Sequence, residues 1–303
     1  MKNILGLFVL IASLAISGIA QVGPPVNAPP APTPDPFPAA TEAAKITGRS
    51  NDLRMTELFP VASDKERKII RNQINPKYRK STDEERELVA PTDGVKAQYA
   101  DFLKKKNTGI VRLIADKGCV AKDDVVSGKA ECAKYSMPGG GSAYSFRMKD
   151  YRLVRLADIN FTKNRFEALG TLTHGILLYL GDVPIESVTL ESEGMKHLQK
   201  IKPARNFADA GTYAGKIAKG YKDNGFVYAS IMKAIPGRTY VLRTIAYRGE
   251  AVKTVGGLPY NELMFDKRRD MIVVFRVAAM NPGEDITLVW RELKDKKAPV
   301  LKK

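Results

Sequence analysis

Hydrophobic residues recur with a period of two along much of the chain beyond residue 107. The pattern is clearest over residues 271–280, and it returns over residues 286–291 after a turn that contains Pro282 and Gly283. A period of two places apolar side chains on one face of a strand, so these two runs predict a β-hairpin. Similar runs, rich in β-branched and aromatic residues, predict further strands over residues 110–114, 144–148, 152–161, 165–169, 173–180, 185–190, 226–235 and 238–247.

Residues 61–106 carry the spacings of helices instead. The pairs Ser63/Glu66 and Thr82/Glu85 are capping-box patterns that predict two helix starts. We expect the first of these helices to end at Pro76, because a proline in a helix interior removes a backbone hydrogen bond. A third helix is expected from Asp93 onward, with its apolar residues on one face.

Two more helices are expected within residues 191–220, one capped by Ser192 and one running from Asn206 to Gly220. Since these helices interrupt the strand series rather than alternate with it, the pattern favours antiparallel sheets. The fold class predicted is α+β: an antiparallel β-rich, sandwich-like domain with inserted helices over residues 107–296, preceded by a short helical segment over residues 61–106. A basic tail over residues 297–303 follows it.

The first 20 residues have the layout of a secretory signal peptide. Lys2 precedes an uncharged, largely apolar stretch, and Gly18 and Ala20 supply the small residues that a signal peptidase needs. An uncleaved membrane anchor is the alternative, because the apolar stretch of about 17 residues is near the lower limit for a membrane-spanning helix. We expect cleavage after residues 1–20, a secreted or periplasmic product, and no transmembrane span after cleavage.

Residues 21–60 are expected to form a Pro/Ala-rich spacer that is largely disordered. Proline-rich segments favour extended conformations and bury no hydrophobic core. The spacer separates the signal peptide from the predicted folded part.

Two cysteines, Cys119 and Cys132, are the only ones in the chain. In an oxidising compartment such a pair is expected to form a disulfide bond, worth about 3 kcal/mol in the chain-entropy description. Two buried free thiols are the alternative. The sequence has no C-x-x-C spacing, and His174 and His197, its two histidines, are distant from the cysteines. We therefore expect no metal site and no cofactor.

The net charge of +16 favours anionic partners: an envelope polymer, a glycan or a lipid head group. Nucleic acid is not expected, since few exported proteins meet a genome. The densest basic runs are residues 104–106, 267–269 and 294–303. Of these, Lys267, Arg268 and Arg269 are the first candidates for an anion-binding patch, because they cluster in a loop between strands. The alternative is a diffuse, solvated basic surface.

Sequence signatures of common enzymes are absent or incomplete. Neither G-x-S-x-G nor H-E-x-x-H occurs. Ser230 and Lys233 match the S-x-x-K pattern of serine–lysine enzymes, but in a predicted strand residues three apart face opposite sides. His174 lies in a strand-like run and His197 in a predicted helix, where structural roles are favoured. No catalytic residue is assigned.

These features favour an exported, non-enzymatic binding or envelope-associated protein that contacts an anionic partner. The alternative is an exported hydrolase that acts on polysaccharide or peptidoglycan, which needs two carboxylates facing each other across a cleft. A component of a larger envelope assembly is a third possibility, and an exposed apolar patch would support it.

Overall fold

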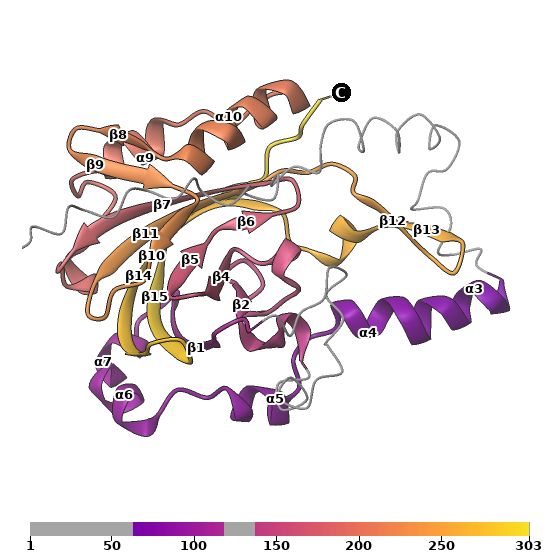
Figure 1. Cartoon of the computed structure of the whole chain (residues 1–303), viewed down its shortest axis with the longest axis horizontal. Helices are drawn as coiled ribbons and strands as arrows, with labels where there is room; N and C mark the ends of the chain where they lie inside the picture. The colour runs from indigo at the N-terminus through magenta and orange to yellow at the C-terminus, as the bar shows by residue number, and fades with distance from the viewer. Residues whose placement is uncertain (1–62, 118–136, 303) are drawn as a thin grey trace, which may run out of the picture. The chain divides into compact units, whose positions relative to one another are not determined.

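A computed structural model describes residues 63–117 and 137–302 of the chain (Figure 1), and these fall within one compact unit. The expected signal peptide, most of the spacer and both cysteines lie outside the described residues, so those expectations stay predictions. The described part is built mainly from antiparallel β-sheets with a few helices, which confirms the predicted α+β, β-rich fold class.

The larger sheet has eight strands, and every pair in it is antiparallel. Its longest strands, β14 and β15, form the hairpin expected near the C-terminus. Across the sheet the order is β1 (Thr108–Ile114), β15 (Asp285–Lys297), β14 (Arg269–Asn281), β11 (Thr239–Ala246), β7 (Thr173–Gly181), β9 (Phe226–Ala229) and β8 (Tyr221–Asp223), with β6 (Leu169–Gly170) paired to β7.

A smaller sheet of five strands packs against it. Its order is β10 (Ile231–Lys233), β5 (Arg165–Glu167), β4 (Ile159–Thr162), β2 (Ala143–Ser145) and β3 (Asp150–Tyr151). A separate two-stranded ribbon consists of β12 (Val252–Val255) and β13 (Leu258–Asn261). The eight-stranded and five-stranded sheets form the sandwich-like arrangement that the strand pattern predicted.

Alternation along the central strands divides the buried side chains between two cores. On β14, Val273 and Phe275 belong to the core between the two sheets, together with Phe166 of the smaller sheet. Ile272 and Val274 point the other way, into a core that includes the helices. The larger sheet is therefore buried on both faces along its middle strands.

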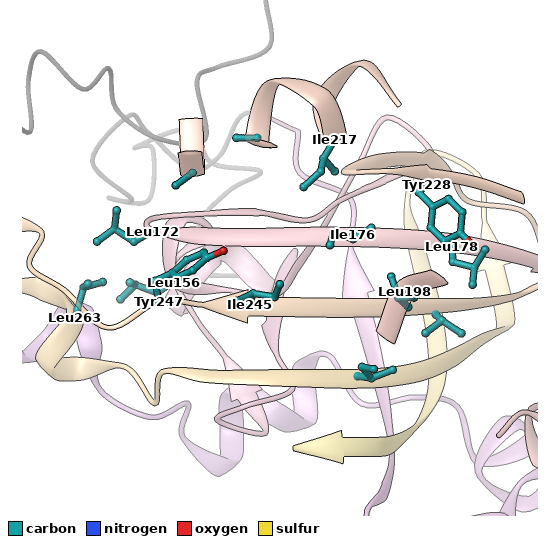
Figure 2. Packing of buried hydrophobic residues seen from close by; sticks show 14 of the residues in the cluster. Leu156, Leu172, Ile176, Leu178, Leu198, Ile217, Tyr228, Ile245, Tyr247 and Leu263 are labelled. Atoms are coloured by element: carbon teal, nitrogen blue, oxygen red, sulfur yellow. The ribbon is translucent and has the colours of Figure 1, made fainter. Parts of the chain in front are cut away.

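Helices α9 (Met195–Lys200) and α10 (Phe207–Lys219) cover the second face of the larger sheet. Figure 2 shows Leu198 and Ile217 of these helices with Ile176 and Ile245 of the strands in one apolar cluster. The predicted cap of α10 is confirmed, since the Asn206 side chain accepts a hydrogen bond from the Asp209 backbone N–H.

The helical segment before β1 consists of short pieces. They are α3 (Asp64–Ile69), a π-helical turn (Ile70–Ile74), α4 (Asn75–Tyr78), α5 (Asp83–Leu88), α6 (Asp93–Gln98) and α7 (Ala100–Leu103). Both predicted capping boxes are present. The expected stop at Pro76 is wrong: the wider turn before it places Pro76 in the first turn of α4, where a missing N–H costs no hydrogen bond.

Several of the predicted strands differ in the structure. The run 165–169 is divided at Ala168, since β5 belongs to the smaller sheet and β6 pairs with β7 of the larger one. Residues 185–190 contain the 3₁₀ turn Ile185–Ser187 instead of a strand, and the run 152–161 is split by another, Val154–Leu156. The run 226–235 is divided at Ser230, since β9 joins the larger sheet and β10 the smaller one. An apolar run can serve two sheets, and periodicity alone does not locate the change.

The C-terminal residues after β15 pack onto the domain. Ala298 and Leu301 are buried, and the Lys302 N–H donates to the Arg205 carbonyl at 2.9 Å. The segment thus runs beside the loop between α9 and α10, with its side chains at Val300 and Lys302 exposed.

Candidate anion-binding site

A small recess opens where the end of α9 meets strands β11, β14 and β15. The space among its side chains is about 190 Å³ when the open solvent at its mouth is counted, and about 10 Å³ of this can hold the centre of a water-sized group, so the recess is shallow. It is lined by Gln199, Arg243, Asp270, Ile272, Lys294 and Lys296. Four of these six side chains are charged, and three of the four are cationic.

Strand register brings the sheet residues of the recess together. Lys294 lies opposite Ile272, and Lys296 lies opposite Asp270. Arg243 of β11 lies opposite Ile272 on the other side of β14. Directly opposed residues of neighbouring strands face the same side, so all five project from the face that α9 covers. A register shift between the Ile272 and Val273 pairs sets Lys294 and Lys296 on this face.

The floor of the recess is an ion pair between Arg243 and Asp270. Arg243 donates from Nε and Nη2 to the two carboxylate oxygens of Asp270, at 2.9 and 2.8 Å. Its Nη1 donates to the carbonyls of Leu198 and Ile201, at 2.7 and 2.8 Å, at the C-terminal end of α9. A cation is favourable at a helix C-terminus. Arg243 is therefore a structural support whose charge Asp270 already balances.

The two lysines on the rim have no such balance. Lys294 Nζ donates to Gln199 Oε1 at 3.2 Å, and Gln199 Nε2 donates to the Leu190 carbonyl at 2.6 Å. Lys296 is exposed. Within residues 63–117 and 137–302, neither lysine forms an ion pair with a carboxylate. The rim thus carries two uncompensated ammonium groups around a concave site, which suits a carboxylate, phosphate or sulfate.

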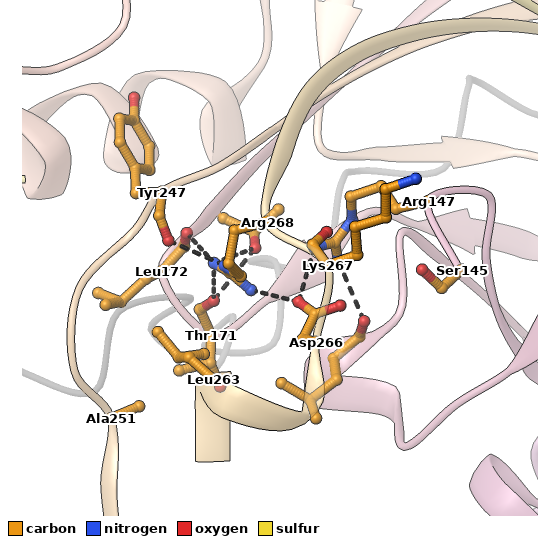
Figure 3. Close-up of polar contacts among 12 residues, drawn as sticks. Ser145, Arg147, Thr171, Leu172, Tyr247, Ala251, Leu263, Asp266, Lys267 and Arg268 are labelled. Atoms are coloured by element: carbon orange, nitrogen blue, oxygen red, sulfur yellow. Dashed lines mark hydrogen bonds and ion pairs between the residues drawn. The ribbon is translucent and has the colours of Figure 1, made fainter. Parts of the chain in front are cut away.

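The three residues predicted from the sequence are not brought onto one surface. Figure 3 shows Arg268 directed toward Asp266 and toward the backbone at Thr171 and Leu172. Arg268 is buried, and it donates to Asp266 at 2.7 Å and to the carbonyls of Tyr247 and Leu172. Burial, with Arg147 nearby, lowers the pKa of Arg268 to about 10. Arg269 pairs with Asp295 at 2.6 Å, and Lys267 is exposed. Only Lys267 and Arg269 are thus accessible to a ligand; their anion-binding role stays a prediction.

Arg268 belongs to a buried ionic network between the two sheets. Arg147 bridges Asp158 at 2.7 Å and Asp266 at 2.6 Å, with all three side chains at 0% exposure. Asp158 also accepts from the Thr244 hydroxyl of β11 at 2.8 Å. Burial raises the pKa of Asp266, but Arg147 and Arg268 outweigh it and hold that pKa below its ordinary value. With every carboxylate paired to an arginine, this network is structural.

The residues that the sequence offered for catalysis are separated. Ser230 is buried and Lys233 is exposed on β10. His174 lies inside the domain, whereas His197 contacts Asp223 at 3.1 Å near the surface. Among the residues that the structure describes, no group of three or more His, Cys, Asp or Glu side chains could hold a metal ion.

The basic run 294–303 is visible in the sequence, but nothing in the sequence singles out Lys294 and Lys296 within it. A period of two along β15 would have placed them on one face, yet their nearness to Gln199 depends on the packing of α9. Gln199 itself carries no signal in the sequence.

The chain matches no protein-family model, no curated protein and no solved structure. Across the described ranges, the helices are all too short or too polar to cross a membrane.

Proposed function

We propose that this chain is an exported, non-enzymatic binding protein that holds an anionic partner in the cell envelope or outside the cell. The recess at the end of α9 is the binding site, and Lys294 and Lys296 are the residues that contact the anion. Export rests on the signal-peptide layout of the first 20 residues.

One observation carries the proposal: two ammonium groups without a carboxylate partner in the described residues border the same concave site. The ion pair beneath them supports the proposal. Asp270 is bonded to Arg243, so its carboxylate balances the charge of Arg243 and not that of the two lysines. An anion that enters gains charge-assisted hydrogen bonds from two flexible donors.

The test compares the binding of inorganic triphosphate to the full chain and to two charge-matched double variants. Lys294→Gln/Lys296→Gln removes the ammonium groups of the rim. Lys222→Gln/Lys253→Gln removes two exposed lysines that lie on β8 and β12, away from the recess. We expect the rim variant to bind about tenfold more weakly and the control variant to bind as the unchanged protein does, because two charge-assisted contacts are lost. Equal weakening in both variants would refute a localised site.

The loop at Lys267 and Arg269 is tested in the same experiment. Lys267→Gln/Arg269→Gln removes the two accessible charges of this loop and leaves Arg268 and its buried contacts in place. A loss of binding in this variant alone would move the site to that loop. Release of product from envelope polysaccharide or peptidoglycan under the same conditions would favour the hydrolase alternative instead.

A further inference from the structure

Two segments of the chain extend from the recess and meet again at a distance from it. One is residues 199–206, from the last turn of α9 to the cap of α10, and the other is residues 294–302, from the end of β15 through the residues that follow it. They touch at the recess, where Lys294 Nζ donates to Gln199 Oε1 at 3.2 Å. They touch again where the Lys302 N–H donates to the Arg205 carbonyl at 2.9 Å. We call this pair of segments the cationic strip.

Other residues hold the strip in place between these two contacts. The Ala204 N–H donates to the Tyr247 hydroxyl at 2.9 Å, and the Arg248 N–H donates to the Pro299 carbonyl at 2.8 Å. Leu301 is buried beneath it. Because these contacts use backbone atoms of the strip, its side chains at Lys202, Arg205 and Lys302 stay exposed.

The charge of the strip is almost all positive. Its two segments hold seven basic side chains and one acid, Asp295. That acid is bonded to Arg269 at 2.6 Å. Within the described residues, the exposed cations with no ion pair to a carboxylate are Lys200, Lys202, Arg205, Lys296, Lys297 and Lys302, and Lys294 is half-buried.

The length of the strip exceeds any single anionic group. In β15 the chain rises about 3.4 Å per residue, so Lys294 and Lys297 lie about 10 Å apart along the strand, and Lys302 follows five residues later. A single phosphate or sulfate can bind at the recess, but it cannot at the same time contact Arg205 and Lys302, where the two segments meet a second time. A flexible chain of anionic groups can contact both.

We infer that the cationic strip binds a linear polyanion, a polymer with repeated phosphate, sulfate or carboxylate groups, with one of its groups in the recess. This rests on the proposed function and narrows it from an anion to an extended anionic polymer. Each contact along the strip releases a counterion from the polymer, so several modest contacts add up to firm binding that salt weakens.

The experiment measures the affinity of the full chain for triphosphate and for long-chain polyphosphate at several salt concentrations. The distal variant Lys202→Gln/Arg205→Gln/Lys302→Gln removes charge at the far part of the strip. The matched control Lys222→Gln/Lys233→Gln/Lys253→Gln removes the same charge from exposed lysines on other strands. We expect the distal variant to bind long polyphosphate about tenfold more weakly and with a shallower salt dependence, since three surface contacts are lost.

The distal variant should bind triphosphate as the unchanged protein does, because the recess is intact. Equal affinity of the distal and control variants for long polyphosphate would overturn the inference while leaving the recess as a site. If the rim variant Lys294→Gln/Lys296→Gln bound both triphosphate and long polyphosphate as tightly as the unchanged protein does, the proposed function would instead be overturned. Binding to phosphatidylglycerol vesicles without binding to polyphosphate would also contradict a polymer ligand.

Discussion

At the scale of single residues, His174 illustrates how a polar group becomes part of the core. Its Nε2 lies 3.0 Å from the Ala210 carbonyl, so this nitrogen carries the proton and donates it. Its Nδ1 accepts from the Tyr247 hydroxyl at 2.8 Å. Both nitrogens of a neutral imidazole are therefore satisfied, and the ring ties α10 to β7 without a charge.

Burial lowers the pKa of His174 to about 4, from an ordinary value of 6.5. The unfolded chain therefore takes up a proton at this residue before the folded chain does. The contribution of neutral His174 to the free energy of unfolding is fully present above about pH 7 and is lost as the pH falls toward 4. The free energy of unfolding should therefore fall by about 2 kcal/mol between pH 7 and pH 5 on account of this residue.

The measurement is the free energy of unfolding in urea at these two pH values, for the unchanged chain and for His174→Gln. We expect the variant to be less stable at pH 7 but to lose less stability on acidification. His197 is present in both proteins, so the difference between them isolates His174. Parallel losses in the two proteins would show that His174 does not titrate on unfolding.

At the scale of elements, glycines with different surroundings predict opposite effects. In α10, Gly211 and Gly215 are exposed, and a Cβ at either position would meet no atom within 4 Å. In β7, a Cβ on Gly175 would lie 2.2 Å from the Ala168 carbonyl oxygen. Gly211 and Gly215 can therefore be replaced by alanine without a clash. Gly175 cannot, because it allows β7 to approach the backbone of Ala168 closely.

We expect Gly211→Ala and Gly215→Ala each to raise the free energy of unfolding by about 0.5–1 kcal/mol, since alanine loses less backbone entropy in a helix. Gly175→Ala should lower it by about 1–3 kcal/mol, because the neighbouring backbone must shift. Chemical denaturation of the three variants checks both signs. A destabilised Gly211→Ala would mean that α10 packs against something at this position.

How far the sequence predicts the elements depends on whether local chemistry decides them. Strand β14 and the cap of α10 were predictable because a period of two and an Asn side chain act over a few residues. The 3₁₀ turn at Ile185–Ser187 was not, since its apolar residues are buried by tertiary packing and read like a strand. The recess depends on α9 meeting three strands, β11, β14 and β15, which no local pattern encodes.

At the scale of the whole molecule, the interior and the surface respond differently to salt. The ion pairs of Arg147 and Arg268 are buried, so dissolved ions screen them little. The surface carries most of a net charge of +16, and like charges repel one another in the compact state.

We therefore expect sodium chloride to stabilise the chain as its concentration rises from about 0.01 M to about 0.15 M, where the screening length falls from about 30 Å to about 8 Å. The midpoint of urea unfolding should increase over this range. It should increase less in Lys222→Gln/Lys233→Gln/Lys253→Gln, which carries three fewer positive charges. A midpoint that falls with salt would mean that exposed ion pairs outweigh the repulsion.

The passage of the chain through Ser230 has a consequence for how the two layers come apart. Strand β9, before this serine, belongs to the larger sheet, and strand β10, after it, belongs to the smaller sheet. Separating the two sheets therefore pulls on the backbone at Ser230 and disturbs a strand of each sheet. Local unfolding of one sheet at this point therefore propagates to the other sheet through the backbone. We therefore expect the two sheets to unfold as one cooperative unit, joined at a place where the sequence shows a single strand-like run.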